Sequence, residues 1–342
     1  MKKAKTISCL LVVFLVFVSF FPDSSFALDE DGRAYEVGDN GEATITAYSG
    51  PDGAVTIPAQ LGGHDITAIG SDVFTTVNIS SLFIPKGILT IDGGAFWECR
   101  TLNNIDIDAE NPNYTSIDGI AYSKDKTVLV HYPAAKSGTS YIVPDNVAAI
   151  ERCAFDHNQN LKSISLPETV IQIGDSAFWR CQSLIELIIS KNVTEIGDAA
   201  FANCSSLTDL TVDAGNPSYK SVGGVLFDIS GSNLIQYPAG KSDSYSAPQG
   251  TSTLGSGSFR GCTQLKEVIL RRSYWPVSLE KAAGVEGEVQ SIYMMDFNSP
   301  SSGLKKRLSQ MMMRLAICSV SACVDVSFLT ARFGMAGLIP ST

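Results

Sequence analysis

Four of the eight cysteines recur at one place in a repeated phrase, so thiol chemistry is the first to weigh. Cys99, Cys181, Cys204 and Cys262 each stand three residues after a phenylalanine. Thiolates bind zinc through closely spaced pairs such as C-x-x-C, and the sequence contains no such pair. We therefore expect no metal site. The alternatives are buried thiols or, in an oxidising compartment, a disulfide between Cys181 and Cys204.

The three histidines do not assemble into a catalytic motif. His64 follows a pair of glycines, His131 has Gln236 as its counterpart in a second copy of its segment, and His157 occupies a place that varies between repeats. A hydrolytic triad needs a nucleophile held by a histidine and an acid. The chain contains neither G-x-S-x-G nor H-E-x-x-H. We expect no enzymatic activity and no cofactor.

Acidic residues near the ends of predicted strands could bind calcium. They are Asp106, Asp108, Asp209 and Asp213. Calcium takes about six to eight oxygen ligands, which proteins gather in a shaped loop. No calcium-loop motif surrounds these residues, so the expected role is a solvated acidic face.

A repeated phrase must position all of these side chains. It reads IGDSAFWRCQSL in one copy, and the phenylalanines of its six copies are Phe74, Phe96, Phe155, Phe178, Phe201 and Phe259. Consecutive phenylalanines are 22, 59, 23, 23 and 58 residues apart. A fixed period of this length is typical of a solenoid, whose units bury their apolar sides against one another. A solenoid usually supplies a binding surface rather than a catalytic pocket.

Each unit contains the pattern L-x-x-L-x-I. It occurs at Ile79–Ile84, Leu102–Ile107, Leu161–Leu166, Leu184–Ile189, Leu207–Val212 and Leu265–Leu270. The alternating apolar residues predict a short strand with one buried face. The following A-F-x-x-C-x-x-L stretch, with apolar residues three apart, predicts one helical or 3₁₀ turn. The predicted fold is a β-rich α/β solenoid with parallel strands and 23-residue coils.

These patterns resemble the BspA-like leucine-rich repeats of bacterial surface proteins over about residues 55–270. The resemblance implies that small side chains inside the coil bond loop backbone; the candidates for this ladder are Cys99, Asn158, Cys181, Cys204 and Cys262. It also implies ligand binding on the concave strand surface, where the candidates are Asn104, Asp106, Ser163, Ser165, Glu186, Ile188, Asp209, Thr211 and Glu267. The implied function is adhesion to a host or matrix protein, or to another cell.

A second repeat, with an offset of 105 residues, explains the two long spacings. DAENPNYTSIDGIAY begins at Asp108, and DAGNPSYKSVGGVLF begins at Asp213. The Asp118-Gly119 pair is a strong hairpin signal. We therefore expect hairpin-containing inserts at about 108–137 and 213–242, each either an elaborated coil or a functional protrusion.

The two ends differ from the repeats. Residues 1–27 predict a secretory signal peptide, with basic residues, an apolar core and a cleavage site before Leu28. Residues 28–54 predict a hairpin that caps the solenoid. Residues 271–342 show no repeat and hold six of the seven methionines. This tail indicates a frameshift or recombination within the gene or, alternatively, a genuine separate segment.

The charge is distributed unevenly along the chain. The whole chain carries −10, the signal region +2 and the tail +3, which leaves −15 for residues 28–270. Nucleic acid is an unsuitable partner, because phosphate binding needs clustered Lys and Arg. The apolar core of the signal region is too short for a comfortable membrane span, so we expect no membrane insertion after cleavage.

The sequence thus predicts a secreted or cell-surface binding protein that recognises a protein or glycan ligand without catalysis. One alternative is a carbohydrate-binding or envelope-structural module. Others are a fragment of a larger surface enzyme and a truncated remnant without function. Trp97 and Trp179 follow repeat phenylalanines, where they either pack over a corner or contact a partner.

Overall fold

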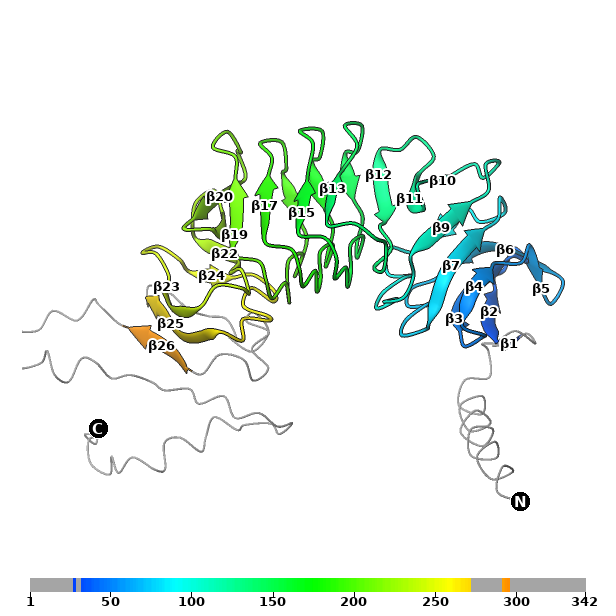
Figure 1. Ribbon diagram of the computed structural model, residues 1–342, viewed down its shortest axis with the longest axis horizontal. Coiled ribbons are helices and arrows are strands. Elements are labelled where there is room, and N and C mark those ends of the chain that lie inside the picture. Colours follow the sequence, from blue (N-terminus) through cyan, green and yellow to red (C-terminus); the bar gives the residue numbers. More distant parts are fainter. Residues whose placement is uncertain (1–26, 29–31, 272–290, 296–342) are drawn as a thin grey trace, which may run out of the picture.

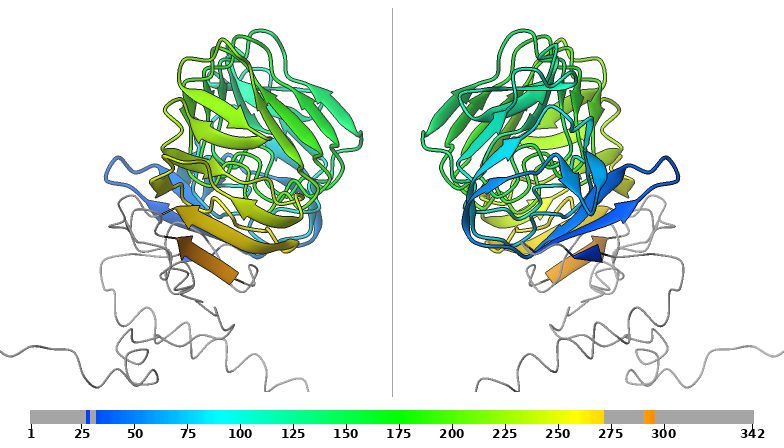
Figure 2. Two further views of the ribbon diagram at one scale, coloured as in Figure 1. Left: turned by 90° about the vertical axis from the view of Figure 1, so that its left-hand side faces the viewer. Right: turned by 90° about the vertical axis from the view of Figure 1, so that its right-hand side faces the viewer.

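The computed structural model describes residues 27–28, 32–271 and 291–295 (Figure 1). Most of the predicted signal peptide and most of the predicted tail lie outside the described residues. Figure 1 shows the coils side by side in a curved row, and Figure 2 shows them overlapping when the row is viewed from either end. The predicted parallel-strand solenoid is confirmed.

The strands of the L-x-x-L-x-I pattern, together with further strands that do not match it, form three parallel sheets. The first is β4 (Gly53–Thr56), β7 (Ile79–Ile84) and β9 (Asn104–Ile107). The second is β13 (Ser140–Ile142), β15 (Ser163–Ser165), β17 (Glu186–Ile189) and β19 (Asp209–Val212). The third is β23 (Asp243–Ser246), β25 (Leu265–Arg271) and β26 (Ser291–Met295). We call the outward side of these strands the strand face, and the three sheets its N-terminal, central and C-terminal panels.

The N-terminal end of the row is a mixed sheet. The antiparallel strands β1 (Ala27–Leu28), β2 (Arg33–Val37) and β3 (Ala43–Tyr48) come first. Strand β3 then pairs in parallel with β6 (His64–Ile69), and β6 pairs with β8 (Thr90–Ile91). The short β5 (Gln60–Leu61) pairs antiparallel with β6. The chain therefore changes from antiparallel to parallel pairing at β3.

Two further sheets contain antiparallel strands, which begin where the 105-residue repeat begins. The first contains β10 (Tyr114–Ile117), β11 (Ile120–Ser123), β12 (Val128–His131), β14 (Ala149–Ile150), β16 (Gln172–Ile173) and β18 (Glu195–Ile196). The second contains β20 (Tyr219–Val222), β21 (Val225–Asp228), β22 (Asn233–Gln236) and β24 (Thr253–Leu254). We call the segments with β10–β12 and β20–β22 the first and second hairpin coils.

The repeat phenylalanines stack into columns inside the coils. Phe155 and Phe178 have ring centroids 5.0 Å apart and planes 9° apart, and Phe178 and Phe201 are 5.4 Å and 11° apart. All three rings are buried. Burying one such side chain contributes about 1.5–3 kcal/mol. A 23-residue period therefore places each ring against its own copy.

The helical part of the predicted fold class is not confirmed, because no helix occurs in the part of the chain that the structure describes. In the turn that holds Phe178, Ser176 and Arg180 adopt left-handed backbone with φ of 53° and 55°. Alternate amides leave the coil: Ser176 N donates to Asp198 O, and Phe178 N donates to Ala200 O. A helix needs consecutive right-handed residues and internal bonds. The turns instead continue the ladder between coils, so the described fold is a β-solenoid.

The described residues also contain no helix that is long and apolar enough to cross a membrane.

Candidate functional site

The central panel aligns the predicted binding residues of neighbouring coils. Parallel pairing places Ser163 beside Glu186 and Glu186 beside Asp209. In the second row, Ile188 lies beside Thr211. The exposed members are Ser163, Ser165, Glu186, Ile188 and Thr211, whereas Asp209 is half-buried. Four coils thus present one polar row with two carboxylates and a second row of mixed character.

The strand face also carries exposed apolar side chains, of which the sequence analysis named only Ile188. Ile142 pairs with Ser165 at the edge of the central panel and is 76% exposed. Ile188 is 61% exposed, and Phe83 on the N-terminal panel is 38% exposed. Phe83 occupies the outward position of a recognised repeat, so its signal was present in the sequence. The sequence contains no such signal for Ile142, because its short strand does not match L-x-x-L-x-I.

The hairpins divide the strand face into its panels. At the edge of β9, Ile105 N donates to Gly119 O at 3.0 Å, and at the edge of β19, Leu210 N donates to Gly224 O at 3.0 Å. The hairpin turns therefore occupy the edges at which the next parallel strands would pair. Asn104 and Asp209 lie against these turns, since a Cβ added at Gly119 or Gly224 would meet their side-chain oxygens.

The remaining predicted residues lie on the outer panels. Asn104 Nδ2 donates to Asp106 Oδ2 at 2.7 Å in the N-terminal panel. Glu267 lies in the C-terminal panel, half-buried, and pairs with Ser244. The structure thus places the nine predicted residues on three separate panels rather than on one continuous strip.

The predicted ladder residues lie inside the coils. Cys181 Sγ donates to Phe155 O at 3.1 Å, and Cys204 Sγ donates to Phe178 O at 3.0 Å. Asn158 Nδ2 also donates to backbone of the preceding coil, at Ala134 O over 3.3 Å. Cys99, Cys153, Cys181, Cys204 and Cys262 are buried free thiols. Burial raises the pKa of Cys99 to about 12, so this thiol stays protonated and unreactive at neutral pH.

The three histidines lie in three different places. His131 is 1% exposed and contacts the Phe96 ring at 4.6 Å, and burial lowers its pKa to about 3. His64 Nδ1 is 2.9 Å from Gly41 O near the N-terminal sheet. His157 is buried at a turn of the solenoid. His131 is therefore a neutral core residue at neutral pH.

His157 belongs to a buried cluster that the sequence analysis did not find. Its Nδ1 is 2.8 Å from Asp156 Oδ1, and its Nε2 is 3.7 Å from Glu98 Oε1. Asp156 also accepts a 2.7 Å bond from Glu98 N, and burial raises the pKa of its carboxyl. The cluster joins two turns that are 58 residues apart in the sequence, because the first hairpin coil contributes no turn between them. It ties the turns together across this gap.

The acidic residues weighed for calcium bond backbone or neighbouring amides. Asp108 Oδ1 accepts from Glu110 N, and Asp213 Oδ1 accepts from Gly215 N, both at 2.8 Å. Within residues 32–271, no group of three or more His, Cys, Asp or Glu side chains is arranged to hold a metal ion.

Trp97 and Trp179 pack on one another over the turns. Their ring centroids are 5.5 Å apart, and the Arg260 guanidinium lies 4.9 Å from the Trp179 ring. Trp179 is only 8% exposed. The pair therefore packs over a corner, although Trp97 keeps part of its surface accessible.

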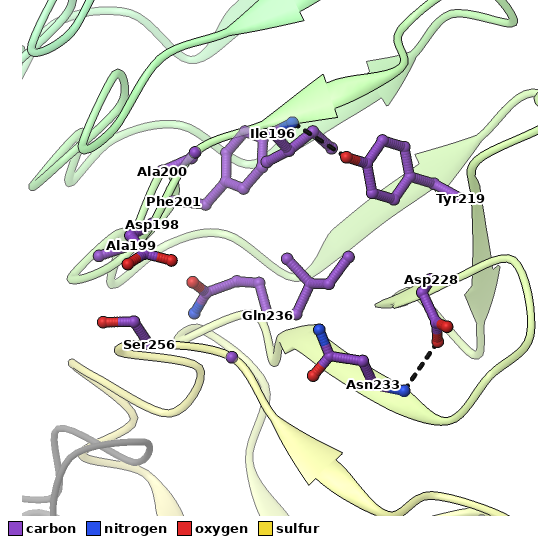
Figure 3. A pocket seen from close by; sticks show the side chains of 13 residues that line it. Ile196, Asp198, Ala199, Ala200, Phe201, Tyr219, Asp228, Asn233, Gln236 and Ser256 are labelled. Carbon is purple, nitrogen blue, oxygen red and sulfur yellow. Dashed lines mark hydrogen bonds between the residues drawn. The ribbon is translucent and has the colours of Figure 1, made fainter.

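A cavity of about 200 Å³ lies beside the second hairpin coil (Figure 3). Its walls come from the corner after β18, from β20–β22 and from the corner after β24. Figure 3 shows Asp198, Gln236 and Ser256 gathered at one end, with Asn233 farther along. None of these residues lies on the strand face, and sequence reasoning did not predict this cavity.

The chain is similar to several solved structures of bacterial proteins. A leucine-rich cell surface protein from Faecalibacterium prausnitzii is 24% identical, with a TM-score of 0.45 over 73% of this chain and 72% of its own. A leucine-rich repeat protein from Eubacterium ventriosum is 20% identical, with a TM-score of 0.48 over 81% and 96%. The pneumococcal vaccine antigen PcpA is 22% identical, with a TM-score of 0.44 over 80% and 70%.

Among curated proteins, none matches this chain. The sequence pattern of the BspA type leucine rich repeat region matches in six copies, over residues 55–135, 131–240 and 237–278. These residues make up more than half of the chain and include all six L-x-x-L-x-I segments. The protein therefore belongs to the family of BspA-type leucine-rich repeat proteins.

Proposed function

We propose that this protein is a secreted or surface-displayed adhesion module that binds another protein through its strand face, without catalysis. The observation that carries the proposal is the exposure of Ile142 and Ile188 beside Glu186 on the central panel. Large apolar side chains in a polar surround are typical of protein interfaces. Leucine-rich repeat proteins of this type are generally non-catalytic binding modules.

The charge of the repeat region favours a basic partner. Residues 28–270 carry −15, and Glu186 and Asp209 occupy paired positions of neighbouring strands on the central panel. Complementary charge accelerates encounter and selects against acidic partners. The partner proposed here is a protein with a basic, partly apolar surface.

The remaining assignments come from the sequence. Residues 1–27 would direct secretion, 28–54 would cap the solenoid, and 271–342 would follow it as a separate or frameshifted tail. The segments 108–137 and 213–242 would be elaborated coils, since their hairpins bond β9 and β19. Binding of a glycan, or a structural role in the envelope, remains the alternative that the test below distinguishes.

The test uses the purified full-length chain on an array of extracellular matrix proteins, mucins and glycans. We expect saturable binding to a protein, weakened at least about tenfold by Ile188→Lys on the central panel, which removes apolar contact area and repels a basic partner. Ile171→Lys is the matched control, because Ile171 is 50% exposed but lies outside the strand face. Equal loss in both variants, or binding that survives Ile188→Lys, would contradict a site on the central panel. Binding only to glycans would favour the alternative.

A further inference from the structure

The cavity beside the second hairpin coil exists because that coil contributes no turn to the stack. The turn after β18 and the turn after β24 are neighbours in space, although about one hairpin coil separates them in the sequence. They meet at Gly257, where an added Cβ would lie 3.1 Å from Ala199 Cβ. Nearer the corner, Gly255 contacts β22 instead, since a Cβ added at Gly255 would lie 3.0 Å from Ile235 O. The space between Asp198 and Ser256 therefore stays open.

Four polar groups that line this cavity keep unused hydrogen-bonding capacity within the described chain. Gln236 is 1% exposed, and its Nε2 donates to Tyr237 O and Ser258 O, which leaves Oε1 as a free acceptor. Asn233 Oδ1 accepts from Thr253 Oγ1 at 3.0 Å, which leaves Nδ2 as a free donor. Asp198 and Ser256 are exposed residues at the open end of the cavity, and the Asp198 carboxylate and the Ser256 hydroxyl bond no described residue. Buried amides usually satisfy both of their ends.

Asp228, the other lining carboxylate, serves the hairpin rather than the cavity. It accepts bonds from Ser230 Oγ, from Ser232 Oγ at 3.2 Å and from Asn233 N at 2.7 Å. Burial opposes its ionisation, but these hydrogen bonds outweigh that effect and lower the pKa of Asp228. Its oxygens are therefore committed to the turn between β21 and β22.

The first hairpin coil provides an internal control. There the counterparts of Asp198, Asn233, Gln236 and Ser256 are Gly93, Val128, His131 and Arg152. The Arg152 side chain packs against the glycine corner, since a Cβ at Gly93 would lie 3.0 Å from Arg152 Cβ. Its Nη1 reaches Asp92 Oδ1 at 3.4 Å. In the first hairpin coil, where Arg152 fills the corner, other residue types thus replace all four cavity residues.

The chemistry of the cavity selects among ligand classes. The lining contains Asp198 but neither lysine nor arginine, so an anion would meet a carboxylate without a compensating charge. A protonated amine could donate to Asp198 and Gln236 Oε1, but it has no acceptor for Asn233 Nδ2. A hydroxyl group donates and accepts, so it can satisfy all four groups. Ile196, Ile235 and Phe201 add apolar wall on which a ring can rest.

We propose that this cavity binds a neutral, hydroxyl-rich ligand of about one pyranose ring, at a site separate from the strand face. The carboxylate of Asp198, the amide oxygen of Gln236 and the hydroxyl of Ser256 contact hydroxyl groups at the open end. The amide nitrogen of Asn233 donates to a further hydroxyl oxygen. The site is independent of the proposed adhesion, because none of these residues lies on a strand-face panel.

The test measures binding of methyl pyranosides to the full-length chain by saturation-transfer NMR. The probes are the methyl glycosides of glucose, galactose, mannose and N-acetylglucosamine, with n-butylamine as the cationic probe. We expect Kd on the order of 1 mM for at least one glycoside, because one ring supplies few contacts. Ser256→Arg introduces the residue type found at the same place in the first hairpin coil, and it should weaken binding at least about tenfold. Asn233→Val likewise introduces the residue type of the first hairpin coil and should also weaken binding.

Arg152→Ser is the matched control, since it alters the same corner of the first hairpin coil and should leave glycoside binding unchanged. Three results would overturn the proposal. They are no glycoside signal with the wild-type chain, equal binding by the wild-type and Ser256→Arg chains, and preferential binding of n-butylamine. Strand-face variants should not affect this signal, so failure of the adhesion proposal and failure of this one remain distinguishable.

Discussion

The two hairpin coils keep the same backbone bonds and differ in the side chains at their corners. Asn111 Nδ2 donates to Ile88 O at 2.8 Å, and Asn216 Nδ2 donates to Val193 O at 2.9 Å. Tyr114 OH and Tyr219 OH accept bonds of 3.0 Å from the amides of β8 and β18. These bonds explain the N-P-x-Y motif, because each asparagine and tyrosine replaces the pairing that the missing parallel strand would have supplied.

At the corners, the two coils differ in side chains that form no hydrogen bond with a described backbone group, Arg152 and Ser256. Arg152 fills the first corner, whereas Ser256 leaves the second corner open. A comparison of the two copies thus distinguishes residues that stabilise the solenoid from residues that can vary and acquire a function. A side chain that differs between the copies and lines a cavity is a better candidate for binding than one that recurs in both.

The largest expected effect comes from removing the shared amides. Asn111→Ala and Asn216→Ala should each lower the free energy of unfolding by about 3 kcal/mol, because both leave buried carbonyls and amides without partners. Urea unfolding followed by circular dichroism of the full-length chain measures this loss. Asn192→Ala is the control, since Asn192 bonds Glu168 O at an exposed position and should cost about 0.5 kcal/mol or less.

Similar losses at Asn111 and Asn216 would support one common backbone arrangement. A large loss at one position and a control-like loss at the other would contradict it, because the asparagine bonds have nearly the same length in both coils.

A smaller effect distinguishes the coils by pH. His131 in the first hairpin coil corresponds to Gln236 in the second, and burial lowers the pKa of His131 from its usual value of 6.5 to about 3. The unfolded chain therefore binds a proton below pH 6.5 that the folded chain refuses, so stability falls as the pH drops towards 3. Each pH unit in this window costs about 1.4 kcal/mol at most.

Comparing wild type with His131→Gln isolates this contribution, since the other titrating groups are common to both chains. Between pH 6.5 and 4.5 the wild-type chain should lose up to about 2 kcal/mol more than the variant. The measurement is the urea midpoint at both pH values. Parallel pH dependence in the two chains would mean that His131 takes up its proton in the folded state.

Periodic features of the sequence predicted the solenoid, because each repeated apolar residue stacks on its own copy. Leu184, Leu187 and Ile189 are buried as the L-x-x-L-x-I pattern requires. The missing helix was not evident from any one coil, since Ser176 and Arg180 are neither glycine nor asparagine, the usual signals for left-handed backbone. Only the comparison of coils carries the signal, because the same two positions hold Gly257 and Gly261 in the last coil.

Features that join distant turns were also beyond the sequence pattern. Glu98 meets Asp156, and Asp198 faces Ser256 across the cavity, only because a hairpin coil omits its turn. The 105-residue offset aligned the two coils in the sequence. Whether a corner is open, however, depends on side-chain volume and direction, as Arg152 and Ser256 illustrate.

The smallest expected effect is the strongest check on this division between structural and variable residues. Arg152→Ser removes an ion pair whose side chains are 44% and 45% exposed, so the cost should be below about 1 kcal/mol. Most of that cost should vanish in about 1 M salt, where exposed charges are screened. Urea unfolding at low and high salt measures both. A salt-independent loss of about 2 kcal/mol or more would show that Arg152 supports the first corner by packing. Arg152 would then stabilise the first corner, whereas Ser256 has no such role in the second. The open second corner would therefore need another contact that stabilises it.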